Sequence, residues 1–324
     1  MITLIATVLN EGDNIHRLMD SLLRQTRQPD EIVMVDGGST DATPATIQGY
    51  ADRLPLRLLV EPGCNISAGR NQAIAAAQGD IIATTDAGVV LEATWLEHLT
   101  QPLLDDSDVN VVGGFFLAEA DTVFEVAMGA TVLPLVDEID AATFLPSSRS
   151  VAFRKTAWVG VGGYPEWLDY CEDLIFDLRL KATAGAFAFA PDAVAHFRPR
   201  TSLSAFFKQY YRYARGDGKA DLWRKRHAIR YITYLAVFPA VLLLGALVHP
   251  LLWGLYLPGA IVYLYQPYRR LPVVLRRAGR TSAGNWLAAA LLVPVIRVVG
   301  DVAKMLGYPV GWRWRLQNNP PDWN

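Results

Sequence analysis

Acidic residues end two apolar runs of this 324-residue chain, at positions where a carboxylate can meet a bound ligand. Asp36 closes the run 31–35 and is followed by Gly37-Gly38-Ser39-Thr40-Asp41. An acid at a strand end, then glycines, then the polar start of a helix can hydrogen-bond the ribose or base of a nucleotide. The same pattern is equally typical of a turn followed by a helix N-cap.

Asp86 closes a second apolar run, 81–85, and Ala87 and Gly88 follow it. A carboxylate there is costly unless it is paired or binds a cation. A divalent ion at Asp86 can neutralise a diphosphate leaving group. One carboxylate makes a weak metal site, so further ligands must come from phosphates, water or a distant residue. His196 is a candidate ligand, and a core or helix-end histidine is the alternative interpretation.

Glu172 and Asp173 are adjacent carboxylates at the start of a helical pattern over residues 172–184. One of them can take a proton from an incoming hydroxyl, although the helix dipole alone also favours acids there. A polar set then recurs at three-residue intervals, near one face of a helix: Gln209, Arg212 and Arg215. Arginine is well suited to phosphate, and a basic helix beside a membrane has the same composition.

Composition excludes several classes of protein. The chain has 52% hydrophobic and 19% charged residues, a formal charge of −2 and two cysteines. Disordered chains have low hydrophobicity, disulfide scaffolds have dense cysteine, and nucleic-acid binders are usually basic. We therefore expect no nucleic-acid partner. Met1 leads directly into a strand-like run, without a signal peptide, so we expect the N-terminal part to face the cytoplasm.

The first two thirds of the chain alternate strand and helix patterns. Strands are predicted at 2–8, 31–35, 56–60 and 81–85, and helices at 14–25, 41–50, 68–77, 122–133 and 172–184. This alternation predicts βαβ units and a parallel sheet. Ligands bind beyond the carboxyl ends of such strands, so the loops after Ala6, Val35 and Thr85 should hold the chemistry. The first loop lacks G-x-G-x-x-G, which argues against a dinucleotide-binding fold.

The last third is apolar and is interrupted by basic clusters. Uncharged runs at 231–247 and 251–265 together reach about 35 residues, which is too long for one membrane span and right for a hairpin of two short ones. A buried helix pair of a soluble protein is the alternative. Basic residues flank both runs, so both hairpin ends should be cytoplasmic and should attract anionic lipid headgroups. We predict a cytoplasmic domain at 1–225 and a membrane region at 226–324, with the hairpin at about 231–265 and a third membrane-associated helix at about 285–306.

The order of the motifs resembles that of family 2 glycosyltransferases with the GT-A fold. The resemblance covers about residues 1–220 and rests on Asp36-Gly-Gly-Ser-Thr-Asp, Gly69-Arg70-Asn71, Asp86-Ala-Gly, Glu172-Asp173 and Gln209-x-x-Arg212-x-x-Arg215-Gly216. With the membrane hairpin added, the chain is similar to membrane-bound bacterial members that build lipid-linked saccharides. Polyprenyl-phosphate sugar transferases and, more weakly, succinoglycan-type glucosyltransferases are such members.

The resemblance implies roles for individual residues. Asp36 matches the acid that binds the nucleotide base, usually uracil, and the residues matching the first loop of that pocket are Thr7, Asn10 and Glu11. Arg70 matches a residue near the nucleotide. Asp86 matches the metal-binding D-x-D carboxylate, with Gly88 where the family has an acid or histidine. Asp173 matches the general base, with Glu172 beside it.

The Q-x-x-R-W element is matched by Gln209, Arg212 and Arg215, with Tyr213 where tryptophan is common in processive enzymes. That change argues against a secreting polymer synthase. The resemblance thus implies an inverting glycosyltransferase that moves a hexose from a UDP-sugar to a polyprenyl-linked acceptor. It also implies Mg²⁺ or Mn²⁺ as a cofactor. We expect a multi-pass protein of the bacterial inner membrane. A GT-A-fold nucleotidyltransferase and a non-catalytic nucleotide-sugar-binding membrane protein are the alternatives.

Overall fold

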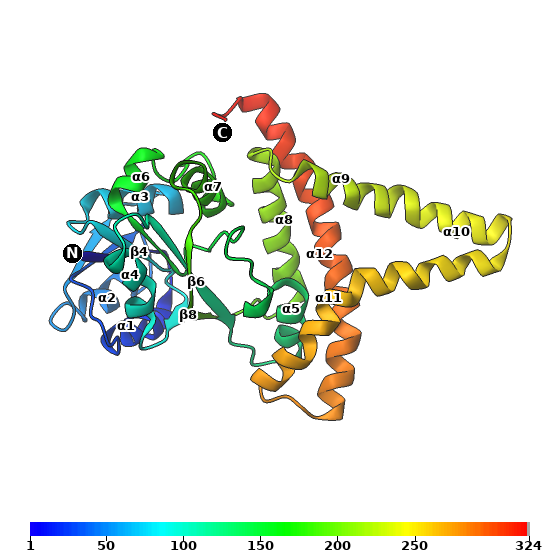
Figure 1. Ribbon diagram of the computed structural model, residues 1–324, viewed down its shortest axis with the longest axis horizontal. Coiled ribbons are helices and arrows are strands. Elements are labelled where there is room, and N and C mark those ends of the chain that lie inside the picture. Colours follow the sequence, from blue (N-terminus) through cyan, green and yellow to red (C-terminus); the bar gives the residue numbers. More distant parts are fainter. Residues whose placement is uncertain (323–324) are drawn as a thin grey trace. The chain divides into compact units, whose positions relative to one another are not determined.

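The computed structural model describes residues 1–322 and divides them into two compact units. The first unit contains Met1–Ala118 and Val136–Arg198, and the second contains Glu119–Leu135 and Pro199–Asp322 (Figure 1). The boundary between the units therefore differs from the predicted domain boundary at residue 225. Two segments predicted to belong to the N-terminal domain, 119–135 and 199–225, are packed among the C-terminal helices instead.

The first unit is built on a mixed sheet. Eight strands of the described chain form it, in the order β3-β2-β1-β4-β7-β6-β8-β5. Their bounds are β1 Ile2–Val8, β2 Glu31–Asp36, β3 Leu56–Val60, β4 Ile81–Thr84, β5 Val89–Leu91, β6 Val111–Ala118, β7 Val151–Arg154 and β8 Ala188–Phe197. The first four strands in the order are parallel, β6 and β8 are also parallel, and β7 and β5 run antiparallel to their neighbours. The predicted parallel arrangement of β1 to β4 is confirmed.

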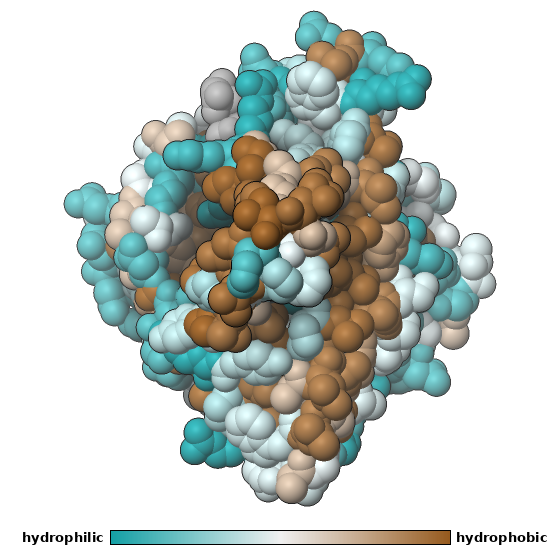
Figure 2. Space-filling model, turned by 90° about the vertical axis from the view of Figure 1, so that its right-hand side faces the viewer, coloured by the Kyte–Doolittle hydropathy of each residue, from teal (hydrophilic) through white to brown (hydrophobic). Residues whose placement is uncertain are grey.

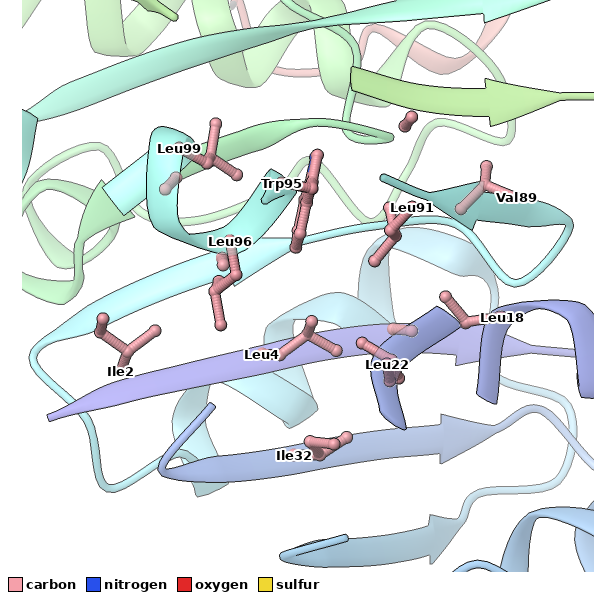
Figure 3. Close-up of a cluster of buried hydrophobic side chains, with 14 of the residues drawn as sticks. Ile2, Leu4, Leu18, Leu22, Ile32, Val89, Leu91, Trp95, Leu96 and Leu99 are labelled. Atoms are coloured by element: carbon pink, nitrogen blue, oxygen red, sulfur yellow. The ribbon is translucent and has the colours of Figure 1, made fainter. Parts of the chain in front are cut away.

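Helices cover both faces of this sheet. They are η1 Gly12–Asn14, α1 Ile15–Leu23, α2 Thr43–Gln48, α3 Ile66–Ala76, α4 Trp95–Asp105, η2 Val136–Glu138, α6 Lys155–Gly160 and α7 Glu172–Ala184. Side chains alternate along β1, so Leu4 packs with α1 and α4 on one face, and Ile5 packs with α3 and α7 on the other. Figure 3 shows the first of these two cores around Leu4, Leu22 and Trp95.

The second unit is helical. Its elements are α5 Val123–Val132, α8 Leu203–Lys219, α9 Arg224–Ile232, the π-helical turn η3 Thr233–Val237, α10 Phe238–Leu247, η4 Pro250–Leu255, α11 Tyr256–Arg277 and α12 Ala283–Asn318. Glycines let α8 and α12 approach closely: a Cβ at Gly307 or Gly311 would lie 2.2 or 1.9 Å from a carbonyl oxygen of α8. This tight packing explains why α8 belongs with the C-terminal helices.

The hairpin between α9 and α11 presents apolar side chains to its surroundings. Trp253 packs on Gly245 and donates a hydrogen bond to the Leu242 carbonyl at 3.1 Å, which holds the turn η4 against α10. Leu247, Leu251 and Val262 are 79–81% exposed, and Figure 2 shows hydrophobic surface gathered over this hairpin. Within residues 1–322, two helices are long and apolar enough to cross a membrane, Arg224–Leu247 and Ala283–Asn318. The returning limb α11 is not one of them.

Candidate active site

Asp36 shapes the loop that follows it. Its side chain is fully buried at the end of β2. Its Oδ1 accepts hydrogen bonds from the Ser39 amide at 3.0 Å and the Ser39 hydroxyl at 2.6 Å. The turn interpretation of this motif therefore holds, and contact between Asp36 and a nucleotide base stays a prediction.

The loop after β1 is held against the loop after β2. Asn10 has a left-handed backbone, with φ of 53°, and its side chain accepts a hydrogen bond from the Thr40 amide at 2.8 Å. The Glu11 amide donates to the Thr43 hydroxyl at 2.9 Å. Burial, Asp86 and Asp41 raise the pKa of the Glu11 carboxyl, so this carboxyl lies within electrostatic range of Asp86. Asn10 and Glu11 lie in one loop, as the sequence predicted. Hydrogen bonds to Thr40 and Thr43 hold this loop at the carboxyl ends of β1 and β2.

Each residue of Gly69-Arg70-Asn71 has a separate structural reason. A Cβ at Gly69 would lie 2.9 Å from the Thr7 methyl group, so glycine lets α3 approach β1. Asn71 fixes the segment before α7: its amide nitrogen donates to the Tyr164 carbonyl, and its oxygen accepts from the Tyr164 amide. Between them, Arg70 points into the unit and is 2% exposed.

Arg70 joins two carboxylates from distant parts of the sequence. Its Nη1 contacts Glu172 Oε1 at 2.9 Å and its Nη2 contacts Asp86 Oδ1 at 2.9 Å. Although burial opposes the charge, Asp86 and Glu172 raise the pKa of Arg70, so it stays protonated. The Tyr164 ring lies 5.2 Å from its guanidinium carbon. Asp86, Arg70 and Glu172, which were predicted separately, therefore form one network.

A second arginine that the sequence did not single out completes this network. Arg149 Nε lies 3.3 Å from Asp86 Oδ2, so each oxygen of Asp86 faces a guanidinium group. The Arg149 guanidinium lies over the ring of Phe197, at 4.8 Å from its centroid. Arg149 precedes the short strand β7 in a segment without periodic pattern, so only the fold brings it to Asp86.

The two carboxylates at the start of α7 differ in environment. The chain enters α7 through Cys171, whose φ is +66°. Glu172 is 7% exposed, and burial, together with the charge of Asp173, raises its pKa to about 7. Asp173 is half-buried, and its Oδ1 accepts from the Leu174 amide at 2.8 Å. Burial also raises the pKa of Asp177, one turn further, well above its ordinary value. Asp173 is therefore the more accessible of the two carboxylates.

The structure pairs His196 with Glu92, and its role as a metal ligand stays a prediction. Its Nε2 lies 2.9 Å from Glu92 Oε1, and it pairs with Val90 in the β5–β8 register. Neighbouring side chains along a strand point to opposite faces. The next residue, Phe197, has its ring against Arg149, which contacts Asp86. No group of three or more potential metal-binding side chains occurs among the described residues. Asp86 alone still fits Mg²⁺ or Mn²⁺, because such ions are often held by one carboxylate together with substrate phosphates.

The predicted phosphate-binding set lies on α8, in the second unit. Gln209 donates to the Tyr213 hydroxyl at 2.7 Å. Arg212 and Arg215 follow at one and two turns along the same helix. Their contact with a donor substrate stays a prediction.

Sequence comparison identifies the first part of the chain. Residues 3–146 match the family model described as glycosyl transferase family 2. The match covers less than half of the chain, and it is this segment that is similar to family 2 glycosyltransferases. The Escherichia coli K12 protein "uncharacterized glycosyltransferase YibD" is 36% identical over 110 residues, which are 33% of this chain and 32% of that protein. The Salmonella anatum O-antigen chain rhamnosyltransferase WbaN is 24% identical over 224 residues, which are 63% and 70% of the two chains.

Solved structures confirm the GT-A fold. The mannosyltransferase PcManGT from Pyrobaculum calidifontis, in complex with GDP-Man and Mn²⁺, has a TM-score of 0.55 at 18% identity, covering 99% of this chain and 88% of its own. TarS of S. aureus has a TM-score of 0.50 at 19% identity, covering 72% and 44%. At such identities the likeness concerns the fold. The match to YibD spans about a third of that protein's length.

Proposed function

We propose that the protein is an inverting glycosyltransferase that moves a hexose from a nucleotide sugar to a membrane-anchored acceptor. One observation carries the proposal. Arg70 ties the Asp86 carboxylate, which lies within the segment that matches family 2, to Glu172 at the start of α7, beyond that segment and immediately beside Asp173. Asp86 and Arg70 of the proposed donor site are thereby linked to the first turn of α7, which carries the proposed base. The match to family 2 supports the donor class, and a UDP-sugar is proposed from the resemblance of the Asp36 motif.

Asp173 is the proposed general base. It removes the proton from the acceptor hydroxyl as that oxygen bonds to the anomeric carbon, and the bond between that carbon and the diphosphate oxygen breaks on the opposite side. General-base help is typically worth about 10²–10⁴-fold in rate. Glu172 is less suited, because it is buried and its oxygen is already bonded to Arg70. In this proposal Glu172 holds Arg70 in place.

Arg149 and Arg70 are proposed to receive the donor diphosphate near Asp86. Guanidinium groups match phosphate oxygens in geometry and charge. A divalent cation, when bound, would be held by Asp86 together with the donor phosphates and would stabilise the charge of the leaving diphosphate. His196 is not part of this proposed site. Gln209, Arg212 and Arg215 are proposed further donor-phosphate residues, and Thr7, Asn10, Glu11 and Asp36 are proposed to line the nucleotide site.

The acceptor is proposed to be polyprenyl-linked and to lie at the cytoplasmic face of a bacterial inner membrane. The support is the exposed apolar hairpin and the two helices long enough to cross a bilayer. Basic residues on both sides of the hairpin favour cytoplasmic ends. Single-cysteine labelling at position 250 and at position 225, from either side of oriented vesicles, tests this topology.

The deciding assay is nucleotide release by the full chain in vesicles of inner-membrane lipid. UDP-sugars and GDP-mannose are supplied in turn, with Mn²⁺ or with a chelator. Sugar-dependent release that needs the lipid extract supports the proposal. Donor binding without release indicates a non-catalytic binding protein, and pyrophosphate release from a nucleoside triphosphate and a sugar phosphate indicates a nucleotidyltransferase. Release that is unchanged without lipid refutes the membrane-anchored acceptor.

A further inference from the structure

A charged network lies among the helices that carry the hairpin. Asp301 of α12 is 6% exposed. It accepts a hydrogen bond from Arg230 Nε of α9 at 2.8 Å and one from the Tyr263 hydroxyl of α11 at 2.6 Å. An ionised side chain among apolar helices is expensive unless it is paired, and such groups commonly mark functional sites. Asp301 and Arg230 neutralise each other's charge. Together with Tyr263 they link α12, α9 and α11.

Two further cations in the same network are not paired. Arg297 and Lys304 lie four residues before and three residues after Asp301, and therefore on the same side of α12. Within residues 1–322, neither makes a hydrogen bond or an ion pair, and Arg297 Nε is enclosed without a partner. Their contacts are with aromatic rings: Arg297 lies 5.0 Å from the Tyr263 centroid, and Lys304 Nζ lies 4.9 Å from that of Tyr210. Both side chains are half-buried.

The charges around Lys304 do not balance. Arg230 and Arg297 oppose the positive charge of Lys304, whereas Asp301 and Asp217 favour it. Asp301 is taken by Arg230, and Asp217 contacts His227 at 3.2 Å. Buried charge is stable only when it is compensated. The cluster of Arg230, Arg297 and Lys304, here called the cationic cluster, therefore fits one further anion.

Helix α11, which contributes Tyr263 to this network, also carries apolar surface. A cavity of about 480 Å³ on α11 is lined by apolar atoms of residues that include Ala260, Leu264 and Tyr268. Leu247, Val262 and their neighbours on the hairpin are exposed. A ligand that suits both features carries an anion on an apolar chain.

We propose that the cationic cluster binds the phosphate headgroup of a membrane lipid. Arg297 and Lys304 donate hydrogen bonds to the phosphate oxygens, and the Arg230–Asp301–Tyr263 contacts hold the helices that carry them. Basic pockets between membrane helices are a known setting for phosphate headgroups. The inference goes beyond the proposed transferase function, because it does not require that the bound lipid be the acceptor.

Lipid binding to the full chain in neutral detergent tests this site. The probe is dioctanoyl phosphatidic acid, and inorganic phosphate and dioctanoyl phosphatidylcholine are the comparisons. The test variants are Arg297→Gln and Lys304→Gln, and the matched control is Arg313→Gln, which removes an exposed cation from the same helix. Each test variant should weaken phosphatidic acid binding at least about tenfold, because a charge-assisted hydrogen bond is lost. The control should stay within about twofold.

Thermal unfolding without added lipid keeps the test decisive if a variant packs poorly. Removal of an unpaired cation should leave the midpoint of Arg297→Gln unchanged or higher, and phosphatidic acid should raise the midpoint of the wild-type chain more than that of the variant. A lower midpoint without lipid means that Arg297 acts by packing on Tyr263, which overturns the proposal. Equal loss of binding in Arg313→Gln, or inorganic phosphate binding as tightly as the lipid, overturns it as well.

Discussion

Replacement of Arg70 by methionine removes the cation between Asp86 and Glu172 and keeps a side chain of similar length. Arg70 is 2% exposed and makes two charge-assisted contacts at 2.9 Å. Without it, Glu172 is a buried carboxylate with no counterion at that oxygen. Breaking a buried ion pair from one side typically costs about 3–5 kcal/mol. We expect a loss of that size in the stability of the first unit.

Two further variants distinguish the loss of the Arg70 contacts from the cost of leaving the Glu172 carboxylate buried without a counterion. Glu172→Gln removes the carboxylate that Arg70→Met leaves behind, so the double variant should recover about 1–3 kcal/mol relative to Arg70→Met. Arg70→Lys keeps the charge, but a single ammonium group lacks the two forked nitrogens that reach Asp86 and Glu172 separately. Its stability should lie between those of the wild type and Arg70→Met.

Amide hydrogen exchange followed by mass spectrometry is the suitable assay, because it reports the opening of α3 and α7 apart from the second unit. Protection of peptides from both helices should fall in Arg70→Met and partly return in the double variant. Peptides from α12 serve as the internal control. Unchanged protection in Arg70→Met, or a double variant no better protected than the single one, refutes the idea that this network holds α3 to α7.

Three further predictions concern the proposed base, pH and helix packing. Asp173→Asn should lower kcat by about 10²–10⁴-fold and leave the donor dissociation constant almost unchanged, as measured by nucleotide release and by donor titration; retained turnover moves the base to Glu172 or Asp169. Because burial raises the pKa of Glu172 from 4.5 to about 7, the stability it contributes is complete below pH 4.5 and is lost as pH rises through 7, by about 3 kcal/mol at 1.36 kcal/mol per pKa unit. Denaturation from pH 4.5 to 8 should show a smaller fall in Glu172→Gln than in the wild type, because the buried Asp177, whose pKa is also raised, remains in both. Gly311→Ala places a Cβ 1.9 Å from the Arg215 carbonyl oxygen and should cost about 1–3 kcal/mol, whereas Gly284→Ala, which meets open space, should not lower the thermal midpoint.

Local patterns predicted the elements of the first unit well, because short apolar strands and periodic helices leave traces in adjacent residues. The predicted strands 2–8 and 56–60 coincide with β1 and β3, and the predicted helix 172–184 coincides with α7. The strand-end positions of Asp36 and Asp86 followed from the same patterns. These features depend on contacts close in sequence, so the sequence alone was sufficient for them.

Features that depend on distant contacts were missed. Arg149 reaches Asp86 across 63 positions of sequence and is placed by the antiparallel strand β7. His196 was linked to Asp86 by residue type, but the register that pairs it with Val90 sets it beside Glu92. The unit boundary depends on the close approach of Gly307 and Gly311 to α8. Without the partner helix, those glycines have no visible role.

The ion pairs of the first unit limit how it can bind a donor diphosphate. In the first unit, both oxygens of Asp86 already face guanidinium groups, and Glu172 is bonded to Arg70. A donor diphosphate must therefore compete with Asp86 for Arg149 and Arg70, or share Asp86 through a cation. Asp86→Asn frees the arginines and removes the carboxylate together. Donor binding that strengthens in this variant and no longer responds to Mn²⁺ identifies the arginines as the phosphate ligands, whereas binding that is lost identifies Asp86 as the essential cation ligand.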